Sequence, residues 1–143
     1  MCIRDRGKAV WTGNIKEGQG LISSQTGVLK DAPYGFASRF EDGPGSNPEE
    51  LLGAAHAACF TMALSLMLTN NGLTADRIET KADVTLAKDG DGFSITKVHL
   101  TTRAKIPGTD QAKFAELAKQ AKEGCPVSKV LKAEISMDAT LEA

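Results

Sequence analysis

Hydrophobic and polar residues alternate through the first part of the chain. Small or apolar residues take every second position over residues 9–16, and glycine-bounded runs follow at 21–26 and 34–40. A period of two is typical of strands that cover one face of a sheet. The pattern therefore predicts an N-terminal antiparallel meander of three short strands.

A long apolar run without a formal charge occupies residues 51–68. Signals at both of its ends favour a helix. Asn47 can act as the N-cap, Pro48 suits the first helical position, and Glu50 follows Asn47 at the spacing of a capping box. Gly72 supplies the stop signal. We expect a single central helix here.

The central run is 18 residues long, at the lower limit for crossing a membrane. It contains several small or polar residues, and the flank at Glu49 and Glu50 is acidic instead of rich in lysine or arginine. These features favour a buried core helix. No membrane partner is expected.

A second alternating segment, residues 78–86, is followed by an Asp-Gly-Asp-Gly turn at 89–92 and a long strand through Ile106. This predicts a hairpin. The parity of the apolar positions switches between Ile95 and Val98, which indicates either a β-bulge or a strand covered on both faces. The pattern leaves both alternatives open.

The rest of the chain predicts two helices and a final strand. Residues 110–123 have helical spacing and end at Gly124, Cys125 and Pro126 open another short helix, and residues 134–141 alternate. Strands grouped at both ends with helices between them predict an α+β fold of antiparallel sheets around the central helix. Large apolar side chains on these elements are core candidates first and pocket lining second: Phe36, Phe40, Phe60, Met62 and Met67.

The central helix also bears on oligomeric state and domain organisation. A helix that is apolar on nearly every side needs cover on nearly every side, so we expect a homodimer that buries it. We expect one domain over residues 7–143. The opening hexapeptide, residues 1–6, reads like a translated sequencing adapter. We interpret it as non-native and exclude it, with its Cys2, from functional reasoning.

Charge and cysteine content narrow the function classes. The chain has 17 basic and 18 acidic residues and a net charge of −1, with no basic stripe of the kind that binds nucleic acid. The N-terminus has no apolar signal segment, and two cysteines beyond Cys2 are too few for a disulfide scaffold. We expect a cytoplasmic protein, in which such cysteines are more often catalytic, redox-sensing or metal-binding.

The two cysteines differ in their surroundings. Cys125 precedes a proline at a helix start, where free amide groups stabilise a thiolate. The position equally suits a small capping residue, so both interpretations stay open for Cys125. Cys59 lies in the apolar helix, where a thiol behaves as a small hydrophobe unless a cation is nearby.

Two histidines could assist the thiols. His56 lies three residues before Cys59 on one helical face, which suits a Cys-His pair, half a metal site with Cys125 as a third ligand, or a buried, hydrogen-bonded core histidine. The last of these is favoured, and no metal or cofactor is expected. His99 shares a strand face with Lys97 and Thr101 and is expected to be exposed.

Three long motifs carry a resemblance to a known family. They are PYGFASRF at 33–40, GSNPEELLGAAHAACF at 45–60 and GCPVSKVLKAEI at 124–135. The chain resembles the osmotically inducible protein C branch of the OsmC/Ohr family, from Gly7 almost to the C-terminus. The resemblance implies an OsmC-like fold, an intertwined homodimer with active sites at the subunit interface, and a thiol-dependent peroxidase that acts on organic hydroperoxides in oxidative or osmotic stress defence.

The resemblance also implies residue roles. Cys59 matches the peroxidatic cysteine, Cys125 the resolving cysteine, Arg39 the activating arginine and Glu49 its carboxylate partner. A dithiol, in relatives typically a lipoyl group, would reduce the resulting Cys59–Cys125 disulfide. Without the resemblance, Arg39 reads as a solvated residue at a strand end and Glu49 as an ordinary first-turn acid.

Helix geometry adds one hypothesis. Glu49 and Cys59 are ten positions apart, which corresponds to about 15 Å along a helix and about 80° around it. We therefore expect Glu49 and Arg39 to serve the Cys59 of the other subunit. Two alternatives from other classes remain: a redox sensor or ligand-binding protein that uses the same thiols without turnover, and a metal-binding domain.

Overall fold

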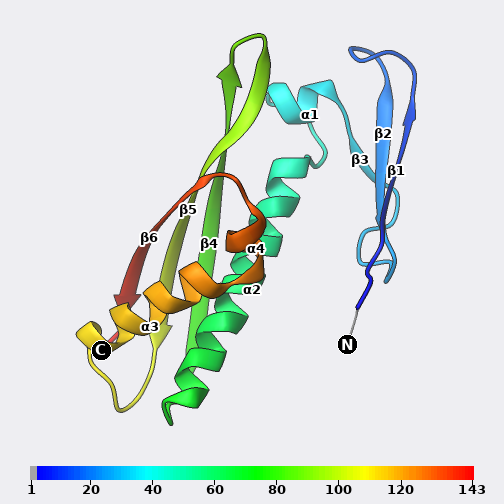
Figure 1. Ribbon diagram of the computed structural model, residues 1–143. Helices are drawn as coiled ribbons and strands as arrows, with labels where there is room; N and C mark the ends of the chain where they lie inside the picture. The colour runs from blue at the N-terminus through cyan, green and yellow to red at the C-terminus, as the bar shows by residue number, and fades with distance from the viewer. Residues whose placement is uncertain (1–2) are drawn as a thin grey trace. The chain divides into compact units, whose positions relative to one another are not determined.

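The computed structural model describes residues 3–143 (Figure 1). Met1 and Cys2, which belong to the hexapeptide interpreted as adapter-derived, lie outside the described residues. Two compact units divide the chain, one ending at Leu51 and the other beginning at Leu52. A single domain over residues 7–143 stays a prediction.

The first unit contains a three-stranded sheet. Its strands are β1 (Gly7–Thr12), β2 (Gln19–Ser24) and β3 (Ala32–Tyr34), antiparallel and in the order β1-β2-β3. The predicted meander is thus confirmed. A Cβ at Gly20 would overlap the ring of Tyr34, so the strand needs a glycine where this ring crosses it.

The prediction of a strand over residues 34–40 is wrong beyond Tyr34, because the short helix α1 (Phe36–Phe40) follows β3. The Ser38 hydroxyl accepts a hydrogen bond from the Gly35 N–H at 2.9 Å, which closes a turn at the start of α1. Phe36 and Phe40 then lie one turn apart with ring centroids 5.1 Å from each other. Arg39 therefore projects from a helix and not from a strand end.

The central helix α2 (Pro48–Asn70) begins and ends as its sequence signals predict. The Asn47 side chain accepts from the Glu50 N–H at 2.8 Å, and Gly72 has a φ of +70° just beyond the last turn. The capping box is only half formed. The Glu50 carboxylate accepts from the Ser46 hydroxyl at 2.7 Å.

The second unit contains a sheet with the order β4-β5-β6. Strands β4 (Arg77–Asp89) and β5 (Gly92–Lys105) form the predicted hairpin. Thr85 pairs with Lys97 and Leu86 pairs with Ile95, which leaves Thr96 as an extra residue. The switch of parity in this strand is therefore a β-bulge.

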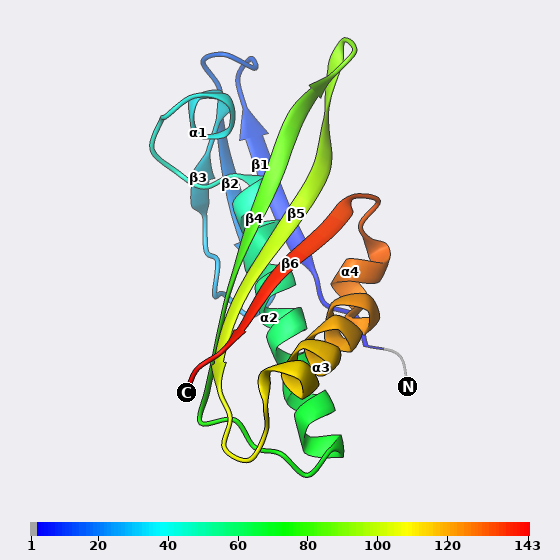
Figure 2. The ribbon, with the colours of Figure 1, turned by 90° about the vertical axis from the view of Figure 1, so that its left-hand side faces the viewer.

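The expectation of antiparallel sheets holds for β4 and β5 but is wrong for β6 (Glu134–Leu141), which runs parallel to β5. Parallel neighbours need a long crossover connection. Here it contains α3 (Gln111–Gly124) and α4 (Pro126–Val130), which Figure 2 shows between β5 and β6 along the chain.

The core of the second unit joins α2, the sheet and α3. Its fully buried members are Phe60, Leu64, Leu68, Val98, Leu100, Phe114, Ala118, Ala121 and Cys125. At Gly53, α2 comes so close to β4 that an added Cβ would lie 3.2 Å from the Ala82 carbonyl oxygen.

Part of α2 within the second unit is exposed. Met62 is 77% exposed and Leu66 56% exposed, so the prediction of Met62 as a core residue is wrong and that of Phe60 is confirmed. The burial of α2 on nearly every side is not found in the single chain. By length and composition alone α2 could cross a membrane, a test that core helices of soluble proteins also pass.

Threonine hydroxyls link α2 to the sheet. Thr61 donates to Thr80 at 2.8 Å, the hydroxyls of Thr80 and Thr102 are 3.1 Å apart, and Thr102 donates to the Glu79 carbonyl at 3.2 Å. Thr102 is fully buried, and this chain supplies its hydrogen-bond partners.

Candidate active site

Two thiols from distant parts of the sequence meet in the second unit. Cys59 lies in the middle of α2, and Cys125 lies between the end of α3 and the start of α4. Both are free cysteines, and their sulfurs are 3.0 Å apart. A disulfide bond is about 2 Å long, so an approach of about 1 Å would join them.

The two sulfurs differ in accessibility. Cys125 is fully buried. Cys59 is half-buried and lines a pocket of about 490 Å³ between α2 and the α3–α4 junction. The other lining residues are predominantly apolar: Met62, Ala63, Leu66, Met67, Ala121, Gly124 and Pro126. A small apolar molecule in this pocket would reach Cys59 before Cys125.

The surroundings favour ionisation of Cys125 over Cys59. Burial raises the pKa of Cys59, and the hydrogen bond with Cys125 raises it further. Burial alone would also raise the pKa of Cys125, but the Cys59 thiol, the N–H and hydroxyl of Ser128 and the N–H of Val127 outweigh it and lower that pKa. A nucleophilic Cys59 therefore needs a nearby cation.

His56 is fully buried and hydrogen-bonded, as predicted. Its Nε2 lies 2.7 Å from the Ser128 hydroxyl, and its Nδ1 has no hydrogen-bond partner among residues 3–143. Burial lowers the pKa of His56, so the ring is neutral. Within residues 3–143, no three His, Cys, Asp or Glu side chains gather in a way that could hold a metal ion.

The expectation that His99 is exposed is wrong. The ring is half-buried, its Nδ1 lies 2.6 Å from the Ser136 hydroxyl, and its Nε2 lies 3.0 Å from the Asp138 carboxylate. The parallel pairing of β6 with β5 places these two partners beside His99.

The first unit holds a second pair of predicted site residues. Arg39 on α1 forms an ion pair with Glu49 in the first turn of α2. Its guanidinium donates from Nη2 to Oε1 at 2.8 Å, from Nε to Oε1 at 3.2 Å and from Nε to Oε2 at 3.3 Å. A further hydrogen bond links the two helices beside this pair: the side-chain amide of Asn47, just before α2, donates to the Ser38 carbonyl in α1 at 3.1 Å. Arg39 is thus a paired guanidinium, with its side chain still 36% exposed.

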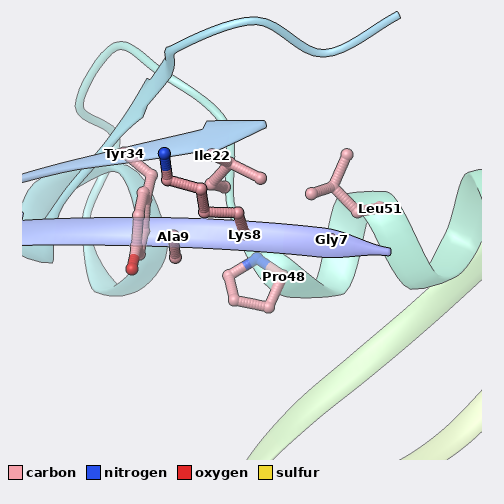
Figure 3. Close-up of a pocket in the computed structure, with 7 residues that line it drawn as sticks. All are labelled: Gly7, Lys8, Ala9, Ile22, Tyr34, Pro48 and Leu51. Carbon is pink, nitrogen blue, oxygen red and sulfur yellow. The ribbon is translucent and has the colours of Figure 1, made fainter. Parts of the chain in front are cut away.

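A different pocket of about 360 Å³ lies within the first unit (Figure 3). Its lining residues come from β1, β2, β3 and the start of α2: Gly7, Lys8, Ala9, Ile22, Tyr34, Pro48 and Leu51. This lining includes neither a cysteine nor Arg39 nor Glu49.

The sequence reasoning missed Ser128. The available signal was its place three residues after Cys125 at a helix start, a position whose amide faces the capping side chain. Its hydroxyl lies 2.7 Å from the Nε2 of His56 and is one of the groups that lower the pKa of Cys125.

Comparison with known proteins places this site in a family. Residues 41–140 match the family described as OsmC-like protein. The chain is 53% identical to Peroxiredoxin OsmC of Escherichia coli strain K12 over 143 residues, all of both chains.

Solved structures show the same fold. An OsmC-like protein of unknown function from Vibrio cholerae O1 has a TM-score of 0.76 at 16% identity, covering 96% of this chain and 99% of that one. The organic hydroperoxide resistance protein OhrB of Bacillus subtilis has a TM-score of 0.67 at 29% identity, covering 96% and 98%. With its two sheets, its long central helix and its full-length similarity to these proteins, the chain belongs to the OsmC family.

Proposed function

We propose that this chain is a thiol-dependent peroxidase that reduces organic hydroperoxides to alcohols. One observation carries the proposal: two free sulfurs lie 3.0 Å apart, one lining an apolar pocket and the other fully buried. The name of the Escherichia coli relative, Peroxiredoxin OsmC, and that of the Bacillus subtilis protein, which refers to organic hydroperoxide resistance, support the same activity.

The reaction divides into two balanced steps. The thiolate of Cys59 attacks the terminal peroxide oxygen, the O–O bond breaks, and the alkoxide takes a proton and leaves as an alcohol, with Cys59 as a sulfenic acid. Cys125 then attacks the Cys59 sulfur, the S–O bond breaks, and hydroxide leaves and is protonated to water. The product is a Cys59–Cys125 disulfide, which an external dithiol such as a lipoyl group reduces.

The apolar lining of the pocket supports an organic substrate. Its predominantly apolar lining gains more from contact with an alkyl or aryl group than from hydrogen peroxide, which is fully polar. Since Cys59 lines the pocket and Cys125 does not, a peroxide held there meets Cys59 first.

Arg39 and Glu49 complete the proposed site. Burial raises the pKa of Cys59, so its thiolate needs a cation, and a guanidinium clamped by a carboxylate provides a fixed one. Because ten helical positions separate Glu49 from Cys59, about 15 Å along the axis, we assign this pair to the Cys59 of a second subunit.

This assignment requires an intertwined homodimer with the active sites at its interface. The uncovered apolar side of α2, with Met62 and Leu66 exposed, is a surface that a second copy of the chain would bury. The proposed setting is the cytoplasm, where the enzyme would act in defence against oxidative or osmotic stress without nucleic acid or membrane partners.

The test is multiple-turnover peroxide consumption with excess dihydrolipoamide, comparing cumene hydroperoxide with hydrogen peroxide. We expect rapid loss of peroxide, faster with cumene hydroperoxide than with hydrogen peroxide. Cys59→Ser should be completely inactive. Cys125→Ser should consume the first equivalent of peroxide normally but form no disulfide. Cys2→Ser is the matched control and should behave as the unchanged protein. Consumption that stops after one equivalent would instead favour a redox sensor, and activity in Cys59→Ser would refute the site.

A further inference from the structure

His56 and Cys125 meet through Ser128 at the start of α4. The Nε2 of His56 lies 2.7 Å from the Ser128 hydroxyl, Ser128 stands three residues after Cys125, the N-cap of α4, and this hydroxyl is one of the groups that lower the pKa of Cys125. His56 and Cys125 are fully buried, so water competes little for these bonds.

The environment of His56 decides the direction of these bonds. The ring is neutral because burial lowers its pKa, and its Nδ1 is buried without a partner. An unpaired buried N–H is rarer in folded proteins than an unpaired acceptor, so Nδ1 is better left as the bare nitrogen. Nε2 then carries the proton and donates it to the Ser128 oxygen, which leaves the Ser128 hydrogen free for Cys125.

We propose that His56 and Ser128 are positioning residues that orient one hydroxyl hydrogen toward Cys125 and thereby stabilise the thiolate form of its sulfur. A serine hydroxyl rotates freely and can donate in several directions. The N–H of His56 blocks the alternative in which Ser128 donates to the ring, so the hydroxyl points to the sulfur in the ground state.

The inference rests on the proposed peroxidase function for its purpose, and it affects both uses of Cys125. A thiolate at Cys125 attacks the sulfenic sulfur of Cys59, the S–S bond forms as the S–O bond breaks, and the hydroxide leaves and is protonated to water. When a dithiol later attacks the pocket-facing Cys59 sulfur, the S–S electron pair passes to Cys125. A sulfur that is stable as a thiolate is the faster leaving group.

The primary test titrates Cys125 without peroxide. In a full-length Cys2→Ser/Cys59→Ser protein, only Cys125 contributes to the ultraviolet thiolate absorbance. Adding Ser128→Ala should raise the pKa of Cys125 by about one, a tenfold fall in the thiolate fraction at a fixed pH below it. Ser136→Ala is the matched control, because it removes a serine–histidine hydrogen bond of 2.6 Å at His99 instead of the one at His56.

A pair of histidine substitutions tests the orienting role. His56→Gln keeps an N–H that can donate to Ser128 and should leave the pKa of Cys125 close to its starting value, whereas His56→Leu should raise it as Ser128→Ala does. If His56→Leu does not fold, the half-buried Ser128→Ala variant and the Gln variant still decide the question.

A kinetic readout follows the resolving step in protein with both site cysteines present. After one equivalent of cumene hydroperoxide, Ser128→Ala should form its sulfenic acid at the normal rate but convert it to the disulfide about tenfold more slowly near neutral pH. The deficit should shrink toward alkaline pH, where Cys125 ionises without help. A distorted fold would give a deficit at every pH.

The outcomes separate the two proposals. An unchanged pKa of Cys125 in Ser128→Ala, or an equal change in Ser136→Ala, would overturn the role of His56 and Ser128 even in an active peroxidase. A raised pKa in a protein that shows no peroxide turnover would support the hydrogen-bond chain and refute the peroxidase function.

Discussion

Oxidation of the Cys59–Cys125 pair should make the chain markedly more stable. The two residues are 66 positions apart in sequence, and their sulfurs already lie 3.0 Å from each other. Closing a loop of this length removes chain entropy from the unfolded state, which stabilises the fold by about 4 kcal/mol. The native structure has to bring the sulfurs about 1 Å closer, a small adjustment at the junction of α3 and α4.

The assay is urea unfolding of the fully reduced protein and of protein oxidised with one equivalent of cumene hydroperoxide, both at the same protein concentration and as Cys2→Ser. The oxidised form should gain about 4 kcal/mol in the free energy of unfolding and melt about 10–15 °C higher. Cys125→Ser treated in the same way should show no gain. Gel electrophoresis without reductant verifies that the bond lies within one chain.

A gain below about 1 kcal/mol in a correctly oxidised protein would refute this reasoning. It would mean that strain in α2 or α4 offsets the entropy of loop closure, and that the reduced arrangement of the sulfurs is not close to the disulfide arrangement. Bonds between chains would refute the assignment of the pair itself.

Further predictions concern the core, the dimer and pH. Leu64→Ala should lower the free energy of unfolding by about 2–5 kcal/mol in urea titrations, because Leu64 is fully buried in the core. Met62→Glu should yield a monomer in sedimentation experiments, since Met62 is 77% exposed on the proposed dimer face; Val28→Glu, at a position 86% exposed, should not. The free energy of unfolding should fall as the pH drops below 6.5, because the unfolded chain protonates His56 there and the folded chain resists it; His56→Gln should flatten that slope in urea titrations across this range.

Much of the fold can be predicted from local signals. The start of α2 follows from Asn47 and its end from Gly72, and the β4–β5 hairpin follows from alternation and an Asp-Gly turn. The strand predicted through residues 34–40 fails because a side-chain hydrogen bond of Ser38 and a pair of phenylalanine rings favour a helical turn over extension.

The direction of β6 cannot be predicted from local sequence signals. Alternation shows that residues 134–141 form a strand with one covered face, but it contains no information about which neighbour the strand joins or in which direction. That choice depends on how α3 and α4 carry the chain back across the sheet, which is a property of tertiary packing.

The candidate site shows the same division. Neither spacing nor composition brings Cys59 to Cys125 or Arg39 to Glu49, and the motifs shared with a family suggested both pairs. Ser128 escaped notice because a serine in a short helix has many ordinary roles, and only the folded chain places its hydroxyl beside His56.

The threonine hydroxyl chain has a consequence for how α2 settles on the sheet. Apolar side chains occur around much of α2, so burial alone would favour several rotations of the helix about its axis by similar amounts. Hydrogen bonds are directional, and the bond from Thr61 to Thr80 forms in only one of these rotations. A turn by a single residue position, about 100°, would carry Cys59 away from Cys125. The threonine hydrogen bonds thus select one rotation of α2 among several that would bury similar apolar surface. The contact between the two thiols depends on that selection.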